Sequence, residues 1–320
     1  MTIKLLTILL ILLPCICHAE VVPSLSSYPV DVIILPNDGQ KPILELIQNA
    51  VESVWICSYN LSDKKIINSL CTAKQCGVDV RVMLEGKQYG NSTINIESAK
   101  KLIGAGIVFS WSNPQFILTH ANYIIVDHCK ILLLTLDLTE SLVRNRGYGV
   151  FISNLEIIRE VEDVFVADWQ KKEHIPAYSG ILLCPDNSTQ GIIELISNTK
   201  KKLWIQTHLL QDEEIMESII EAKKRGVRLR IILAKATPLT NDINLKTQQY
   251  LSKYGISIKL QSIPSPHTMM LFDEKIAFVG SQGLNTRSLN DNREMGIVIT
   301  YPQAIKRLKW IFLHDWKESR

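Results

Sequence analysis

The sequence contains one pattern twice, with one copy in each half. The hexapeptide Gly77–Val82 (GVDVRV) corresponds to Gly226–Ile231 (GVRLRI), which lies 149 residues further along the chain. Trp55 and Trp204 match at the same offset. A repeat of this length has the size of a domain, whereas the repeats of solenoid proteins are only about 20–50 residues long. The chain is therefore predicted to consist of two fused copies of one fold.

Within each copy, strands and helices are predicted to alternate at first, and consecutive strands follow. In the first copy, apolar runs at 32–35, 54–57 and 78–84 predict strands, with helices near 41–50 and 64–74 between them. This order is typical of a mixed β-sheet flanked by helices. We expect an α/β protein of the α+β type with two similar lobes.

The domain boundaries follow from the repeat and from local composition. Residues 1–19 are predicted to be a signal peptide and residues 20–172 the N-terminal lobe. A polar linker with proline and glycine at 173–180 is followed by the C-terminal lobe at 181–320. We expect a monomer with one pseudo-twofold site between the lobes.

The N-terminus has the features of a secretory signal. Lys4 precedes the apolar run Leu5–Leu13, Pro14 ends it, and Ala19 offers a small residue for cleavage. No later stretch is long and apolar enough to span a bilayer, so we expect an exported protein, periplasmic or secreted, without a transmembrane segment. Loss of Lys4 lowers the formal net charge from +3 to +2, which gives no electrostatic argument for nucleic acid.

The cysteines and histidines indicate neither a metal site nor a cofactor, because no Cys/His spacing resembles a zinc site. Cys57 and Cys184 lie in apolar strand-like runs and are predicted to be buried thiols. Cys71 and Cys76 flank a helix end, where they could form a disulfide. We therefore expect no metal and no cofactor.

Each copy carries one histidine at the start of an apolar strand. His120 lies seven residues before Asp127, and His267 lies six residues before Asp273. A lone histidine in such a strand is usually a core residue, but two at equivalent positions, each followed by an aspartate, favour a shared site. The repeat predicts that the two imidazoles meet between the lobes.

The residues around these histidines resemble the phospholipase D superfamily, whose signature is His-x-Lys-(x)4-Asp, then Gly-Ser, then Asn-x-Glu. The resemblance covers nearly the whole chain after the signal peptide, and it is most specific in the second copy after its histidine. The matching residues there are Asp273, Gly280-Ser281, Arg287-Ser288 and Asn292-x-Glu294.

The sequence departs from that signature at several positions. The lysine is replaced by Asn122 in the first copy and by Met269 in the second. In the first copy, Leu134-Thr135 stands for Gly-Ser, and Gly147 stands for the glutamate after Asn145. Both histidines are kept, while the cationic phosphate clamp is depleted.

The resemblance implies a two-step phosphodiester exchange without a metal. One neutral imidazole attacks phosphorus, while the other protonates the leaving alkoxide and then activates water or an alcohol. We expect His120 to be the nucleophile and His267 the general acid, because the spacing of His120 to Asp127 is intact. Asp127 and Asp273 are assigned to the catalytic set. The residues expected to bind the phosphate or the rest of the substrate are Asn122, Thr135, Ser281, Asn145, Asn292, Glu294 and Arg287.

Three functions agree with these features. The first is an exported phosphodiesterase that hydrolyses or transfers phosphatidyl groups through a phosphohistidine. The second is an inactive pseudoenzyme that binds phospholipid or another phosphodiester, as the lost lysines would suggest. The third is a secreted or periplasmic nuclease of the same superfamily. His208, at the strand end equivalent to Tyr59, is a further candidate for contact with the substrate.

Overall fold

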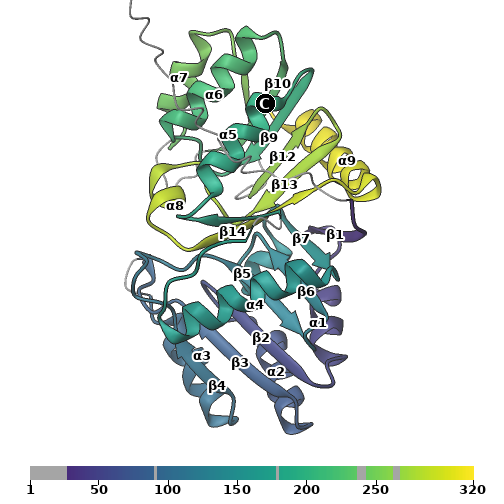
Figure 1. Cartoon of the computed structure of the whole chain (residues 1–320), viewed down its shortest axis with the longest axis vertical. Helices are drawn as coiled ribbons and strands as arrows, with labels where there is room; N and C mark the ends of the chain where they lie inside the picture. Colours follow the sequence, from purple (N-terminus) through teal and green to yellow (C-terminus); the bar gives the residue numbers. More distant parts are fainter. Residues whose placement is uncertain (1–26, 90–91, 178–179, 236–242, 262–266) are drawn as a thin grey trace, which may run out of the picture.

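The computed structural model describes residues 27–89, 92–177, 180–235, 243–261 and 267–320. The predicted signal peptide lies outside these residues. The described chain forms two lobes, each built on a seven-stranded sheet, and the lobes are stacked along the long axis of the molecule (Figure 1).

The N-terminal lobe contains seven strands and four α-helices among the described residues. In chain order they are β1 (Val30–Leu35), α1 (Lys41–Gln48), β2 (Ser53–Ser58), α2 (Lys64–Gln75), β3 (Asp79–Leu84), α3 (Ile94–Gly104), β4 (Val108–Trp111), β5 (Asn122–Val126), β6 (Lys130–Leu134), β7 (Gly147–Ile152) and α4 (Leu155–Gln170). A 3-10 turn at Glu140–Val143 lies between β6 and β7.

The described part of the C-terminal lobe repeats this order and adds a short helix before its last strand. Its elements are β8 (Ile181–Cys184), α5 (Ser188–Asn198), β9 (Lys202–Thr207), α6 (Glu213–Lys224), β10 (Arg228–Ala234), α7 (Leu245–Ser252), β11 (Ile258–Gln261), β12 (Thr268–Phe272), β13 (Ile276–Gly280), α8 (Thr286–Asn290), β14 (Glu294–Ile299) and α9 (Pro302–Glu318).

The two sheets have the same topology. Their strand orders are β4-β3-β2-β5-β6-β7-β1 and β11-β10-β9-β12-β13-β14-β8. In each sheet the first three strands of that order are parallel and the remaining pairs are antiparallel. The prediction of two similar lobes with mixed sheets and flanking helices is confirmed.

The repeated hexapeptides begin where a helix turns into a strand. Gly77 ends the turn after α2 with φ +93°, and Gly226 does the same after α6 with φ +86°. Glycine adopts this left-handed conformation without the steric cost of a Cβ atom. The valine that follows each glycine donates its amide back to the last turn of the helix, to Ala73 and Ala222 respectively. The repeat in the sequence is therefore a repeated helix ending.

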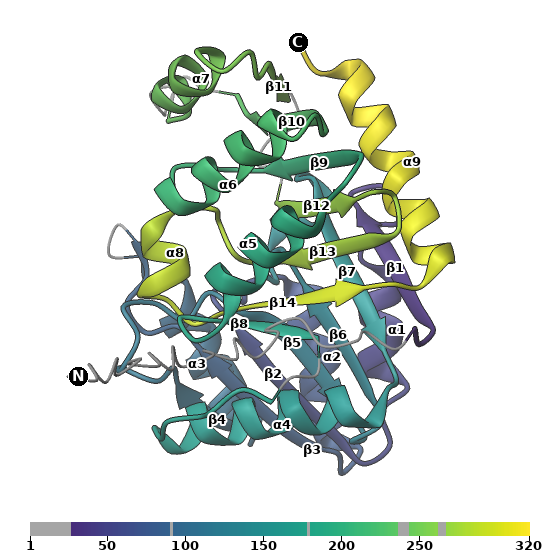
Figure 2. The same ribbon diagram turned by 45° about the horizontal axis from the view of Figure 1, so that its top comes forward.

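The inner faces of the two sheets share one hydrophobic core. Apolar side chains from both sheets join those of α4 and α9 in a single buried cluster. Each lobe has one further cluster, which fills the outer face of its sheet beneath its own helices. The last helix, α9, packs beside β1 of the other lobe (Figure 2). The lobes are thus joined by burial of apolar surface as well as by the chain itself.

The cysteines are free thiols in the described residues. Cys57 and Cys184 are buried, as predicted, and Cys71 and Cys76 do not form a disulfide. No helix in the described ranges is both long enough and apolar enough to cross a bilayer.

Candidate active site

A pocket of about 420 Å³ lies between the lobes, and both histidines line it. Most of its lining residues lie in loops before or after the strands. His120 precedes β5 in one lobe, and His267 precedes β12 in the other. His208 also lines the pocket. The repeat therefore brings two equivalent imidazoles to one cavity, and His208, whose equivalent in the first copy is Tyr59, adds a third.

Each of the two equivalent histidines is anchored to the opposite lobe through its backbone. The amide of His120 donates to the carbonyl of Arg293 at 2.8 Å, and the amide of His267 donates to the carbonyl of Arg146 at 3.1 Å. These reciprocal hydrogen bonds place the pocket on the pseudo-twofold axis.

The imidazole of His120 is paired with a carboxylate. Its Nδ1 lies 3.3 Å from Glu294 Oε2, while Glu294 Oε1 accepts hydrogen bonds from Ser288 Oγ at 2.7 Å and Asn292 Nδ2 at 3.3 Å. The ring of Tyr59 packs against the imidazole, with ring centroids 4.6 Å apart. Glu294 thereby keeps a proton on Nδ1.

This pairing changes the protonation of His120. Burial alone would lower its pKa, but the charge and hydrogen bond of Glu294, with smaller contributions from Asp137 and Glu85, raise the pKa to about 9. His120 is therefore an imidazolium at neutral pH.

His267 has the opposite environment. Burial and, to a smaller extent, the charges of His120 and His208 lower its pKa to about 3. Gly147 occupies the position equivalent to Glu294, and a Cβ atom there would collide with the side chain of Leu136. Among the described residues, no carboxylate raises the pKa of His267, so this imidazole is neutral at neutral pH.

The sequence matches one known family twice. The sequence family described as "Cardiolipin synthase, PLD-like domain" matches residues 43–169 and again residues 192–316. The two matches cover most of the chain. The protein belongs to this phospholipase D-like family.

Curated members are distant in sequence and longer than this chain. The chain is 23% identical over 300 residues to "Probable cardiolipin synthase YwiE" of Bacillus subtilis, covering 87% of this chain and 57% of that protein. It is 22% identical over 279 residues to "Cardiolipin synthase B" of Escherichia coli, covering 74% of this chain and 67% of that protein.

A solved structure of similar extent shares the fold. The phosphatidylserine synthase of Haemophilus influenzae superposes with a TM-score of 0.73 at 13% sequence identity, covering 92% of this chain and 88% of that one. The two-lobe phospholipase D-like fold predicted from the sequence is thus confirmed.

The assignment of Asp127 and Asp273 to the catalytic set is wrong, because both carboxylates lie outside the pocket. Asp127 follows β5 and accepts hydrogen bonds from the backbone amides of residues 51, 52 and 53. Asp273 follows β12 and accepts from the amides of residues 200, 201 and 202. Asp127 and Asp273 also begin the three-residue turns between β5 and β6 and between β12 and β13, at positive φ of 51° and 52°, where aspartate is favoured. The signature aspartates are turn and capping residues at the far ends of their strands.

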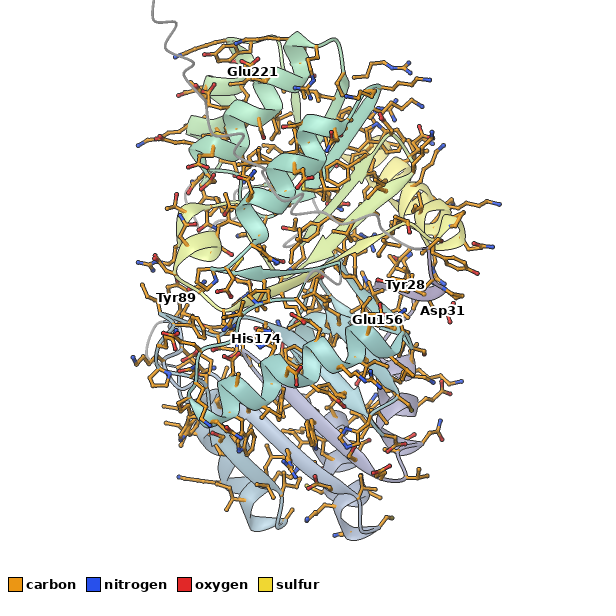
Figure 3. All side chains as sticks on the ribbon, in the orientation of Figure 1. Tyr28, Asp31, Tyr89, Glu156, His174 and Glu221 are labelled. Carbon is orange, nitrogen blue, oxygen red and sulfur yellow. The ribbon has the colours of Figure 1, made fainter. Side chains whose placement is uncertain are left out.

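We expect Asp127→Ala to lower stability and to leave the turnover of bound substrate unchanged. Although burial would raise the pKa of Asp127, its backbone hydrogen bonds lower it, so the carboxylate stabilises the fold above its unfolded pKa and loses this effect as the pH falls. The free energy of unfolding should fall by about 1–3 kcal/mol at neutral pH. Urea denaturation measures this loss, with Asp31→Ala, at an exposed position on β1 (Figure 3), as the control. A fall in kcat without loss of stability would contradict the capping role.

The register of β12 also corrects the position assigned to Met269. Asn122 pairs with Leu134 in one sheet, and Thr268 pairs with Gly280 at the equivalent place in the other. In this segment the second copy is one residue shorter than the first, and the deletion lies between His267 and Thr268. Thr268, and not Met269, therefore corresponds to Asn122. Thr268 lines the pocket, whereas Met269 is buried in the shared core.

Two of the predicted substrate-binding residues are structural. Asn122 is buried, and its Oδ1 accepts from Ser58 Oγ at 2.7 Å and from the Tyr59 amide at 3.1 Å. Thr135 is fully buried and accepts from the Tyr148 amide at 2.9 Å. Neither lines the pocket. The predicted residues that do line it are Asn145, Ser281, Arg287, Asn292 and Glu294.

Several other residues line the pocket without having been predicted from the sequence. Asp137 and Asn285 follow the signature strands closely, and their positions after β6 and β13 could have identified them. Tyr89 follows β3, and nothing in its sequence context indicates a site. It lies at the boundary between the lobes (Figure 3), where its hydroxyl accepts a hydrogen bond from Arg287 Nη1 at 2.9 Å.

Proposed function

We propose that this protein transfers or hydrolyses the phosphatidyl group of a phospholipid through a phosphohistidine on His267, with His120 as the general acid. The observation that carries the proposal is the unequal pair of imidazoles in one pocket, one paired with Glu294 and the other without a carboxylate. A nucleophile must be neutral and a general acid must carry a proton. The assignment reverses the roles expected from the sequence.

The reaction follows in two steps. A ring nitrogen of His267 attacks phosphorus, the bond from phosphorus to the leaving oxygen breaks, and His120 gives its proton to that oxygen. Neutral His120 then takes a proton from water or an alcohol, whose oxygen attacks phosphorus and releases His267. Glu294 holds the imidazolium form of His120 before the first step and after the second.

The choice of a phospholipid is supported by the names of the relatives, two cardiolipin synthases and a phosphatidylserine synthase. A nuclease would use the same two imidazoles, and an assay on both classes of substrate separates the two functions. Purified protein is incubated with vesicles of phosphatidylglycerol, phosphatidylethanolamine or phosphatidylcholine, with and without added glycerol, and in parallel with DNA.

Release or exchange of a lipid headgroup that disappears in His267→Ala would support the proposal. Cleavage of DNA alone would favour the nuclease. Vesicle binding without any product would favour a binding protein that has lost turnover.

We expect Arg287→Gln to weaken substrate binding. Among the described residues, Arg287 is the only arginine or lysine that lines the pocket, and its side chain is exposed and held by Tyr89. A guanidinium at this place can bind the non-bridging oxygens of the phosphate. We expect kcat/KM to fall by about 10–100-fold with most of the change in KM. Arg144→Gln, an exposed arginine paired with Glu140, is the control. A change confined to kcat would contradict a role in binding.

A further inference from the structure

We propose that Arg146 and Arg293, the crossing arginines, are positioning residues that hold the two reacting histidines in register. This inference rests on the proposed function for its catalytic meaning. The backbone carbonyl of each crossing arginine accepts a hydrogen bond from the backbone amide of the histidine in the opposite lobe. Each also fixes its side chain to an aspartate on the closing helix of that same opposite lobe.

Arg293 connects the second lobe to His120 and to α4. Its carbonyl accepts from the His120 amide at 2.8 Å, and its guanidinium lies 3.1 Å from the carboxylate of Asp168 on α4. The same guanidinium donates to Asp186 at 2.7 Å and to the Cys184 carbonyl at 3.1 Å. Its side chain is only 2% exposed, so one buried residue joins three segments around the pocket.

Arg146 makes the mirrored set of contacts in the first lobe. Its carbonyl accepts from the His267 amide at 3.1 Å, and its guanidinium forms a bidentate pair with Asp315 on α9 at 2.7 and 3.0 Å. It also donates to the Leu35 carbonyl at 2.6 Å and to Asn37 at 2.7 Å. The two crossing arginines therefore have the same construction, including a backbone carbonyl and a polar side chain from their own lobe.

These contacts fix the position of the histidine, because the anchored guanidinium and the carbonyl that binds the histidine amide belong to the same residue. A planar guanidinium with several fixed acceptors cannot move without breaking a buried ion pair. A lysine keeps the charge but cannot span the same acceptors. We therefore infer that lysine at either position lets the carbonyl, and the histidine bonded to it, move relative to the other imidazole. Displacements of about 1 Å can cost about a hundredfold in rate.

The two positions differ in the residue that follows. Arg293 is followed by Glu294, which holds the proton of His120, whereas Arg146 is followed by Gly147, which has no side chain to offer. Movement of Arg293 should therefore disturb the Glu294–His120 pair as well as the backbone. Movement of Arg146 should disturb only the placement of His267.

The test compares Arg293→Lys with Arg146→Lys in the full chain. We expect both to lower kcat by about 10–100-fold with little change in KM. In NMR titrations of protein labelled at histidine, the pKa of His120 should fall from about 9 in Arg293→Lys and stay unchanged in Arg146→Lys. Arg307→Lys, in an exposed pair with Asp38, is the control and should change neither quantity.

A purely structural role gives a different result. If both variants lose stability to a similar extent but keep the wild-type kcat and the wild-type pKa of His120, the crossing arginines only join the lobes and the proposal is wrong. Should Arg293→Lys fail to fold, Asp186→Asn removes one partly exposed partner of Arg293 and should lower the His120 pKa in the same direction. An unchanged pKa there would overturn the proposal. The titration needs no turnover, so it decides the matter even if the wild-type protein has no activity on lipid.

Discussion

Alanine at position 267 is expected to abolish phosphodiester turnover on every substrate, with a loss of at least about 10³-fold in kcat. His267 lines the pocket and burial keeps its imidazole neutral, so its loss removes the nucleophile itself. A phospholipid and a p-nitrophenyl phosphodiester should be affected alike, because both must pass through the phosphohistidine. Initial rates on both substrates measure this effect.

Alanine at position 120 should affect the two substrates differently. An alkoxide leaves phosphorus only with a proton, and general acid catalysis contributes about 10²–10⁴-fold. A p-nitrophenolate leaves without one. We therefore expect His120→Ala to lose that factor in the first turnover of phospholipid and much less in the initial burst of p-nitrophenolate from the aryl ester, while the second step, in which His120 takes a proton from water, slows on both. If His120→Ala abolishes both activities while His267→Ala spares the aryl ester, the roles are those expected from the sequence.

Glutamine at position 294 is expected to move the pH dependence of the enzyme. Without the Glu294 carboxylate, burial is opposed only by the smaller contributions of Asp137 and Glu85, and the pKa of His120 should fall well below about 9. The imidazolium that acts as the general acid is then lost at a lower pH. The alkaline limb of the profile of kcat/KM against pH should therefore shift to lower pH by more than about one pH unit. Glu140→Gln, at an exposed glutamate paired with Arg144, is the control.

The same substitution should also change the stability profile. His120 has a higher pKa in the folded protein than when unfolded, so its ion pair stabilises the fold fully below about pH 6.5. This stabilisation declines as the pH rises through about 9. The shift corresponds to about 3 kcal/mol at low pH. Chemical denaturation of Glu294→Gln should show this loss near pH 6 and little loss near pH 10. An equal loss at both pH values would show that Glu294 acts by packing alone.

The fold was predictable because its determinants are local and occur twice. The glycines at 77 and 226 require the same left-handed helix ending, and the apolar strand patterns around them repeat. Burial of two similar lobes against each other then brings His120 and His267 together. Pocket residues close to the signature, such as Glu294 and Ser281, were predictable for the same reason.

The incorrect assignments depended on long-range pairing. Asp127 was assigned to catalysis by its spacing from His120, yet a strand of this length carries it to the far end, where amides of residues 51–53 bind it. Counting from the histidine alone also matched Met269 to Asn122. Only the pairing of β12 with β13 shows that the second copy is one residue shorter directly after its histidine. The roles of the two imidazoles depend on their burial and on the contact of His120 with Glu294. Both are tertiary features that the spacing of residues in the sequence does not predict.

The closed space beside Gly147 has a consequence for how such a site can be built. In a symmetric dimer of identical chains, every substitution appears in both half-sites, so a glutamate beside one imidazole would be accompanied by a glutamate beside the other. Joining the two copies in one chain removes that constraint. Here one copy carries Glu294, and the other has filled the corresponding space with Leu136. Fusion thus allows two histidines of common origin to differ in acidity, so that each can specialise in one half of a proton-coupled reaction.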